Sequence, residues 1–256
     1  MNQPSFLPCA AEILESRIAP AALVTFNYTD ADGQAVSISA NKGTLEQLTA
    51  AIESVPAEDG RMQVVALNLG EVYRGADITI ITGLDPEDGL ATKIGFINAA
   101  GVDLGRVRID GDISRINAGD EVSATPALRL LTVGSWGKFD VTAGETPGEF
   151  DSTVIGGIKA LKVKGDFEGA WLHVRGSDSS SPNFTDRHGR IGDLEIDGSL
   201  LGSARANGGH ISTTGDIGTV TILGSVKGFA ALEPPPEPVL TQHHTGRVSS
   251  GGSMGS

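Results

Sequence analysis

The chain contains little cysteine, few aromatic residues and no long apolar run. Cys9 is the only cysteine among 256 residues, which excludes an intrachain disulfide and a cluster of metal-binding thiolates. Aromatic residues make up 5% of the sequence, so the core has to be built mainly from aliphatic side chains. Because no apolar run reaches about 18 residues, the sequence predicts no transmembrane helix. Residues 1–22 also lack the basic start and unbroken apolar stretch of a secretory signal peptide.

Basic side chains are scarce as well. Lys and Arg total 19 against 32 Asp and Glu, which gives a formal net charge of -13. A protein of this charge repels phosphates, and we therefore expect no nucleic-acid partner. Glycine, in contrast, is abundant at 35 residues, which favours many tight turns between short strands.

Residues 23–90 predict a small α+β unit of the order β-β-α-β-β. Its expected elements are a hairpin over 23–40, a helix over 44–55 that ends before Pro56, and strands over 62–69 and 76–81. Thr44 is a suitable N-cap, with Gln47 three residues later as in a capping box. We expect this unit to cover the first coil of the repeats that follow.

Five segments between residues 104 and 226 align on one glycine. Three aliphatic columns precede that glycine: Leu104, Leu128, Ile158, Ile191 and Ile217; Val107, Leu131, Leu161, Leu194 and Val220; Ile109, Val133, Val163, Ile196 and Ile222. The glycine column is Gly111, Gly134, Gly165, Gly198 and Gly224, and the apolar column after it is Ile113, Trp136, Phe167, Leu200 and Val226. The second segment is one residue short. Such columns predict an all-β fold, in which residues 91–230 form a short parallel β-helix of about five coils.

The sequence changes character at its two ends. Residues 231–256 are rich in Pro, Gly and Ser, which predicts a disordered tail, and residues 1–22 read as a leader-like segment. No amphipathic helix follows the last repeat. We therefore expect the last coil to stay open at Val220, Ile222 and Val226, and the protein to associate with itself through this edge.

Two sets of residues resemble a known group of proteins. Residues 14–21, Leu-Glu-Ser-Arg-Ile-Ala-Pro-Ala, resemble the LExR-type leader of exported surface proteins from planctomycetes and verrucomicrobia. The Thr-Asp-Ala-Asp-Gly segment at 29–33, the Lys-Gly-Thr-Leu segment at 42–45 and the Ile-Gly-x-hydrophobic-x-hydrophobic-x-Gly-Ser repeats are similar to the body of the same group. The resemblance implies a bacterial cell-surface or extracellular protein built from β-solenoid repeats, and it names no active site.

Several side chains are candidates for chemistry. Paired carboxylates cleave glycans in β-helix enzymes, and the candidates for such a pair are Asp110, Asp112, Glu195 and Asp197. The outward charges, however, change sign between the repeats that carry Arg108 and Asp110, Lys162 and Lys164, and Glu195 and Asp197. That alternation favours cross-strand ion pairs on a solvated sheet face.

Metal binding has fewer candidates. Asp30 and Asp32 form a candidate calcium loop, and residues 85–89 form a second acidic loop, although neither completes an EF-hand. The five histidines show no metal-ligand spacing: His173, His188, His210, His243 and His244. We expect no other cofactor. Trp171 is the one aromatic residue outside the inward columns that is a candidate for stacking on a glycan.

These observations favour a non-catalytic structural or adhesive surface module. Its expected partners are extracellular glycans or other surface proteins. The alternative is a polysaccharide-active lyase or hydrolase on the same fold, which would release new chain ends from its substrate. Nothing in the repeats converges on a reactive centre, so we expect no enzyme.

Overall fold

The computed structural model describes residues 23–82, 92–120, 125–139, 150–176, 189–203, 208–228 and 247–250. The predicted leader and Cys9, the acidic loop at 85–89 and most of the predicted tail lie outside the described residues. The all-β prediction is confirmed. Strands dominate the described residues, which otherwise contain α1 (Leu45–Ala51) and two 3-10 turns, Glu58–Gly60 and Glu71–Tyr73.

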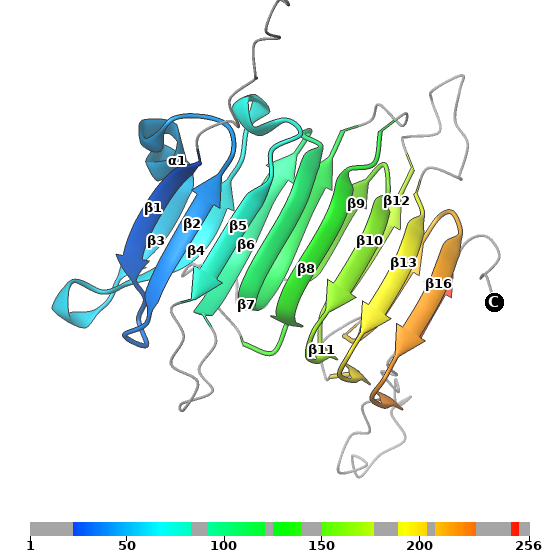
Figure 1. Cartoon of the computed structure of the whole chain (residues 1–256). Helices are drawn as coiled ribbons and strands as arrows, with labels where there is room; N and C mark the ends of the chain where they lie inside the picture. Colours follow the sequence, from blue (N-terminus) through cyan, green and yellow to red (C-terminus); the bar gives the residue numbers. More distant parts are fainter. Residues whose placement is uncertain are drawn as a thin grey trace, which may run out of the picture.

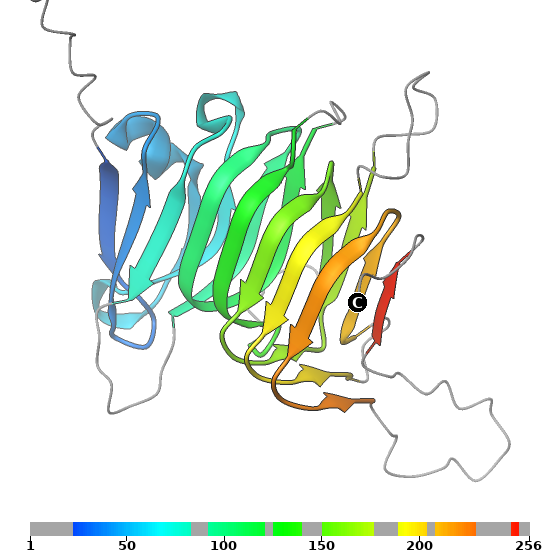
Figure 2. The same ribbon diagram turned by 45° about the vertical axis from the view of Figure 1, so that its right-hand side comes forward.

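The strands form long rows in which segments distant in sequence lie side by side (Figures 1 and 2). The first row contains β1 (Val24–Thr29), β2 (Ala35–Ala40), β5 (Ile78–Thr82), the start of β7 (Leu104–Gly119), β8 (Leu128–Trp136), β10 (Ile158–Val163), β13 (Ile191–Ile196) and β16 (Ile217–Ile222). From β5 onward every pairing in this row is parallel, whereas β1 and β2 join it antiparallel.

A second row runs through the other half of each coil, where a coil is the chain from one strand of the first row to the next. It contains β3 (Ile52–Pro56), β4 (Met62–Asn68), β6 (Thr92–Ala100), the end of β7, β9 (Asp151–Ile155), β12 (Trp171–Arg175), β15 (His210–Thr213) and β18 (Arg247–Ser250). The end of β8 and the short strands β11 (Phe167–Glu168), β14 (Leu200–Leu201) and β17 (Val226–Lys227) make a third row. This arrangement is compatible with the predicted β-helix.

In the first row, residues of the same predicted column lie opposite one another on neighbouring strands. Leu131, Leu161, Leu194 and Val220 pair in succession, and the neighbouring aliphatic columns do the same. Their side chains fill the interior: Leu131, Leu161 and Leu194 are at most 1% exposed. The ladder starts one strand earlier than the repeats suggest, because Ile78 and Ile80 of β5 pair with Val107 and Ile109.

The short second repeat is accommodated by a register shift. Ile109 still pairs with Val133, but Asp112 pairs with Ser135 and Ile113 with Trp136, so β7 carries one extra residue opposite β8. Such a bulge lets both strands keep their apolar residues inside. Trp136 and Phe167 are fully buried, and their ring centroids lie 5.3 Å apart.

The positions of the glycine column have no room for a side chain, because the backbone of the preceding coil lies too close. A Cβ on Gly134 would lie 2.7 Å from the carbonyl oxygen of Gly111, and one on Gly224 would lie 2.4 Å from that of Gly198. Distances below 3.0 Å are incompatible with a side chain unless the backbone shifts. From Gly134 onward, each glycine of the column packs against the glycine of the coil before it, whereas Gly111 packs against the backbone of Thr92. These contacts keep the coils at strand spacing.

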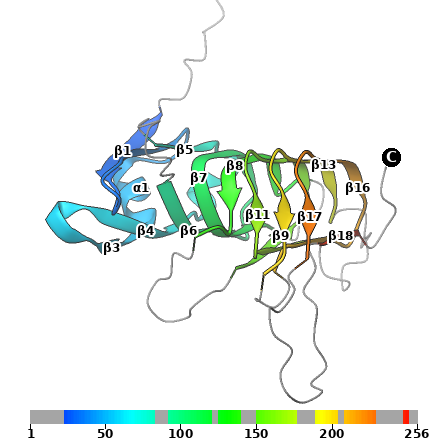
Figure 3. The ribbon, with the colours of Figure 1, turned by 90° about the horizontal axis from the view of Figure 1, so that it is seen from below.

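The N-terminal unit differs from the prediction in one element. Thr44 and Gln47 form the expected capping box, but α1 ends at Ala51, and residues 52–56 form β3 antiparallel to β4. Residues 52–56 form a strand because the β-branched Ile52 and Val55 pair with residues of β4. The two helical turns of α1 are already sufficient to bury Leu48. Figure 3 shows α1 between β1 and β4 at the N-terminal end of the rows.

The C-terminal end also differs from the prediction. β18, inside the segment predicted as a disordered tail, pairs in parallel with β15, with Ile211 opposite Val248. The backbone groups of β15 supply the partners that a strand of four residues needs, and composition alone does not reveal them. Earlier in the last coil, after β16, Leu223 and Val226 are 68% and 56% exposed.

Candidate functional site

The outward charges of the first row are bound to one another. The ammonium of Lys162 lies 2.8 Å from Glu195 and 3.2 Å from Asp197, both one coil farther on. Asp110 binds Arg108 on its own strand at 2.8 Å and Lys164 at 2.9 Å. The pairs of Lys162 and Lys164 join different coils, as the alternating charges predict, whereas Arg108 and Asp110 pair within β7.

The pKa of Asp110 records this pairing. Partial burial acts to raise the pKa, but the hydrogen bonds from Arg108 and Lys164 outweigh it, so the pKa lies below its ordinary value. The carboxylate is therefore ionised at neutral pH. A general acid has to carry a proton near the working pH, which this environment disfavours.

Asp112 has the opposite environment. Its side chain is completely buried and accepts hydrogen bonds from the Ser135 hydroxyl at 2.6 Å and the Phe139 amide at 3.1 Å. Burial raises its pKa, against the effect of these donors. Asp112 thus ties β7 to the chain that follows β8. The candidate carboxylates therefore split between surface ion pairs and one interior anchor.

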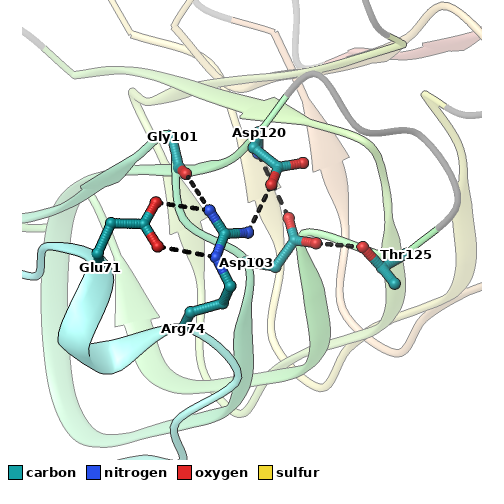
Figure 4. Close-up of polar contacts among 6 residues, drawn as sticks. All are labelled: Glu71, Arg74, Gly101, Asp103, Asp120 and Thr125. Carbon is teal, nitrogen blue, oxygen red and sulfur yellow. Dashed lines mark hydrogen bonds and ion pairs between the residues drawn. The ribbon is translucent and has the colours of Figure 1, made fainter.

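Figure 4 shows a charged cluster that the sequence did not indicate. The guanidinium of Arg74 binds both oxygens of Glu71 at 2.9 and 2.7 Å, Asp120 at 2.5 Å and the carbonyl oxygen of Gly101 at 3.1 Å. Arg74 follows the 3-10 turn after β4, Gly101 lies in the turn between β6 and β7, and Asp120 follows β7. One side chain therefore joins the corners of successive coils.

Asp103 completes this cluster. It accepts hydrogen bonds from the Asp120 amide at 3.3 Å and from the Thr125 hydroxyl (Figure 4). Burial is the main cause that raises its pKa, whereas the Thr125 hydroxyl acts to lower it. Two neighbouring carboxylates in different environments are a pattern that acid-base enzymes use. Here, however, Arg74 binds the Asp120 carboxylate, and the Asp120 amide and the Thr125 hydroxyl bind Asp103. These contacts link the turns at this end of successive coils.

Trp171 lies half-buried on the outer side of the second row. Its indole N–H donates to the Ser212 hydroxyl at 3.1 Å, and its ring stacks on His210 with centroids 6.1 Å apart and planes 13° from parallel. His173 contacts the same hydroxyl at 3.0 Å. Part of the indole is thus covered by β15 of the next coil. Burial, and to a smaller extent Arg175, lowers the pKa of His173, so its imidazole is neutral at pH 7.

Two outward lines of residues cross the second row, and Trp171 belongs to one of them. One line pairs Asn68, Asn98, Asn117, Thr153, His173 and Ser212 in register. The other contains Phe96, Arg115, Asp151, Trp171 and His210, and the Arg115 guanidinium carbon lies 3.8 Å from the Phe96 ring centroid. Together they make one outer face, called the polar face here, which carries amides, hydroxyls, charged groups and aromatic rings.

In the candidate calcium loop, both aspartates are bound by other groups of the protein. Asp30 is buried and accepts hydrogen bonds from the amides of Asp32 and Gln34 at 3.1 and 2.8 Å and from the Thr92 hydroxyl at 3.2 Å. Asp32 binds Lys93 at 2.9 Å. Within the described residues, no three His, Cys, Asp or Glu side chains gather as metal ligands. The loop therefore ties the hairpin turn to β6.

No helix in the described ranges has the length and apolar character needed to cross a membrane. Comparison with known proteins gave no match to a protein-family model, to a curated protein or to a solved structure.

Proposed function

We propose that the chain is a non-catalytic structural or adhesive module of a bacterial surface, exported and built as a β-solenoid. The observation that carries the proposal is the pairing of Asp110, Glu195 and Asp197 with lysines of other coils. These carboxylates hold the stack together, whereas a hydrolase or lyase needs acid and base groups turned toward substrate. Export and surface location rest on the leader resemblance at residues 14–21.

The polar face is the surface that we assign to adhesion. Its side chains repeat at strand spacing and include the amides of Asn98 and Asn117. It also carries two aromatic rings: Phe96, on which Arg115 stacks, and Trp171, which lies beyond β9 from Asn117. An extended glycan presents the matching alternation of apolar ring faces and hydroxyl groups. Trp171 contributes the part of the indole that His210 and Ser212 leave uncovered.

Incubation of the full chain with acidic and neutral polysaccharides tests the proposal. We expect retention of the protein on at least one immobilised glycan, with no release of reducing or unsaturated ends. Trp171→Ala should weaken retention, whereas Thr132→Ala, on the opposite row, should leave it unchanged. Release of new ends would establish the polysaccharide-active alternative and overturn the non-catalytic assignment.

A further inference from the structure

The first row has two edge strands. Among the described strands, β1 pairs with β2 alone and β16 pairs with β13 alone. Natural sheets usually protect such edges with charged residues, proline or bulges, because the unpaired backbone groups bind other strands. Neither edge is protected in this way. β1 reads Val-Thr-Phe-Asn-Tyr-Thr and β16 reads Ile-Gly-Thr-Val-Thr-Ile, and both lack a charged residue.

The edge of the second row at the same end as β1 is different. β3 carries Glu53, ends at Pro56 and shows a register shift between Glu53 and Ser54. These are the protective devices that β1 and β16 lack. The contrast makes β1 the one strand edge at the N-terminal end, within the described residues, that is suited to receive another strand.

The two open edges run in the same direction. β1 is antiparallel to β2, and β2 is antiparallel to β5, so β1 is parallel to β5. All later strands of the row, including β16, are parallel to β5. When two copies are placed end to end, β16 of one copy therefore meets β1 of the next in the parallel sense that the row already uses.

Exposed apolar side chains mark both ends. Leu23 before β1 is 68% exposed and Leu45 on α1 is 53% exposed, while Leu223 and Val226 at the other end are 68% and 56% exposed. Next to them, Val24 and Phe26 at one end and Val220 and Ile222 at the other are only partly buried. Val55, Val72 and Ile81 are also exposed, at 48%, 42% and 45%, but the four most exposed large apolar side chains of the described residues are those at the two ends. Exposed apolar groups of this kind indicate a binding surface.

We propose that copies of this chain bind head to tail, with β16 of one copy pairing in parallel with β1 of the next. The contact would continue the buried aliphatic columns of the first row from one copy into the next. On the outer side, Thr219 and Thr221 would face Thr25 and Asn27 as hydroxyl and amide pairs. Because the two surfaces differ, the contact is heterologous, and it forms an open chain of copies when the rotation does not close a ring. The inference goes beyond the proposed function and holds wherever the protein resides.

Sedimentation velocity over a concentration series tests this contact with the full chain. We expect the mean mass of wild type to rise continuously with concentration, without a plateau at the dimer. Ile222→Lys and, separately, Phe26→Lys each place a charge in the ladder and should weaken association by about tenfold or more. The neighbouring outward substitutions Thr221→Lys and Asn27→Lys are the matched controls and should keep it. If Ile222→Lys fails to fold, Val226→Lys replaces it, since that exposed side chain is dispensable for the core.

Mixing the blocked variants distinguishes the head-to-tail contact from a symmetric one. Phe26→Lys keeps its β16 edge and Ile222→Lys keeps its β1 edge, so each alone should stay monomeric while the mixture forms a dimer of one copy of each. Self-association of Phe26→Lys alone would show a symmetric contact between two β16 edges. That result, or a wild-type chain that remains monomeric at every concentration, would overturn the proposal and leave the glycan-binding test unaffected.

Discussion

The amide of Gly198 donates to the carbonyl oxygen of Gly165 at 3.0 Å, and a Cβ on Gly198 would lie only 2.5 Å from that same oxygen. The hydrogen bond that joins the two coils therefore leaves no room for a side chain. We expect Gly198→Ala to lower the free energy of unfolding by about 1–3 kcal/mol, because the two coils must move apart. Chemical denaturation measures the change.

Gly70→Ala is the matched control for this substitution. A Cβ on Gly70 meets no atom within 4 Å, and its φ is -83°. Its stability should change by less than about 0.5 kcal/mol. Equal effects at Gly70 and Gly198 would show that the loss comes from glycine as such and not from the contact between coils.

Adjacent residues of β13 should respond in opposite ways to substitution. Leu194 is 1% exposed, and Leu194→Asp buries an unpaired carboxylate at a cost of several kcal/mol, roughly the penalty of an uncompensated charge. Glu195 is bound to Lys162 on the solvated side, so Glu195→Gln should cost under about 1 kcal/mol. Thermal melting compares the two variants, and similar shifts would contradict the inward and outward assignment.

The stability contributed by Asp110 should depend on pH. Because the folded pKa lies below the ordinary value of 3.8, Asp110 stabilises the protein above pH 3.8, and this contribution is lost as the pH falls through the folded pKa. Asp110→Asn should therefore be less stable than wild type at neutral pH, by about 1 kcal/mol or less, as is usual for ion pairs at a protein surface. In strong acid the two proteins should melt alike. A difference that persists there would point to a role other than charge.

Arg74 should control the mobility of the corners that it joins. We expect Arg74→Met to speed amide hydrogen exchange at Gly101 and Gly119, whose amides bond across this corner, because Asp120 and the Gly101 carbonyl lose their shared donor. Arg108→Met, which removes an exposed pair on the other row, serves as the control. Unchanged exchange in both variants would show that the backbone alone holds the corner.

The interior ladder was predictable from sequence because each coil uses the same spacing. The columns led by Leu104, Val107 and Ile109 pair in the aligned register, and the glycine column marks the close contact between coils. The capping box at Thr44 and the hairpin over 23–40 followed from local chemistry and were also correct.

Other features depend on contacts that no local pattern contains. β3 was predicted as helix, since the spacing of Ile52 and Val55 suits both structures and pairing with β4 decides between them. Asp112 was a candidate for a catalytic carboxylate pair, but it is buried and bound by the amides of Lys138 and Phe139, which follow β8. Arg74 meets Asp120 across 46 residues and Trp171 meets Ser212 across 41, distances over which the sequence carries no spacing signal.

Protease treatment of intact producing cells tests the central claim most directly. A module displayed at the surface should be removed from intact cells, while a protein known to be cytoplasmic in the same cells stays whole. Detection needs only an antibody against the chain and a lysed sample as the control for cleavage. Protection of the chain until the cells are lysed would contradict its assignment as a surface module.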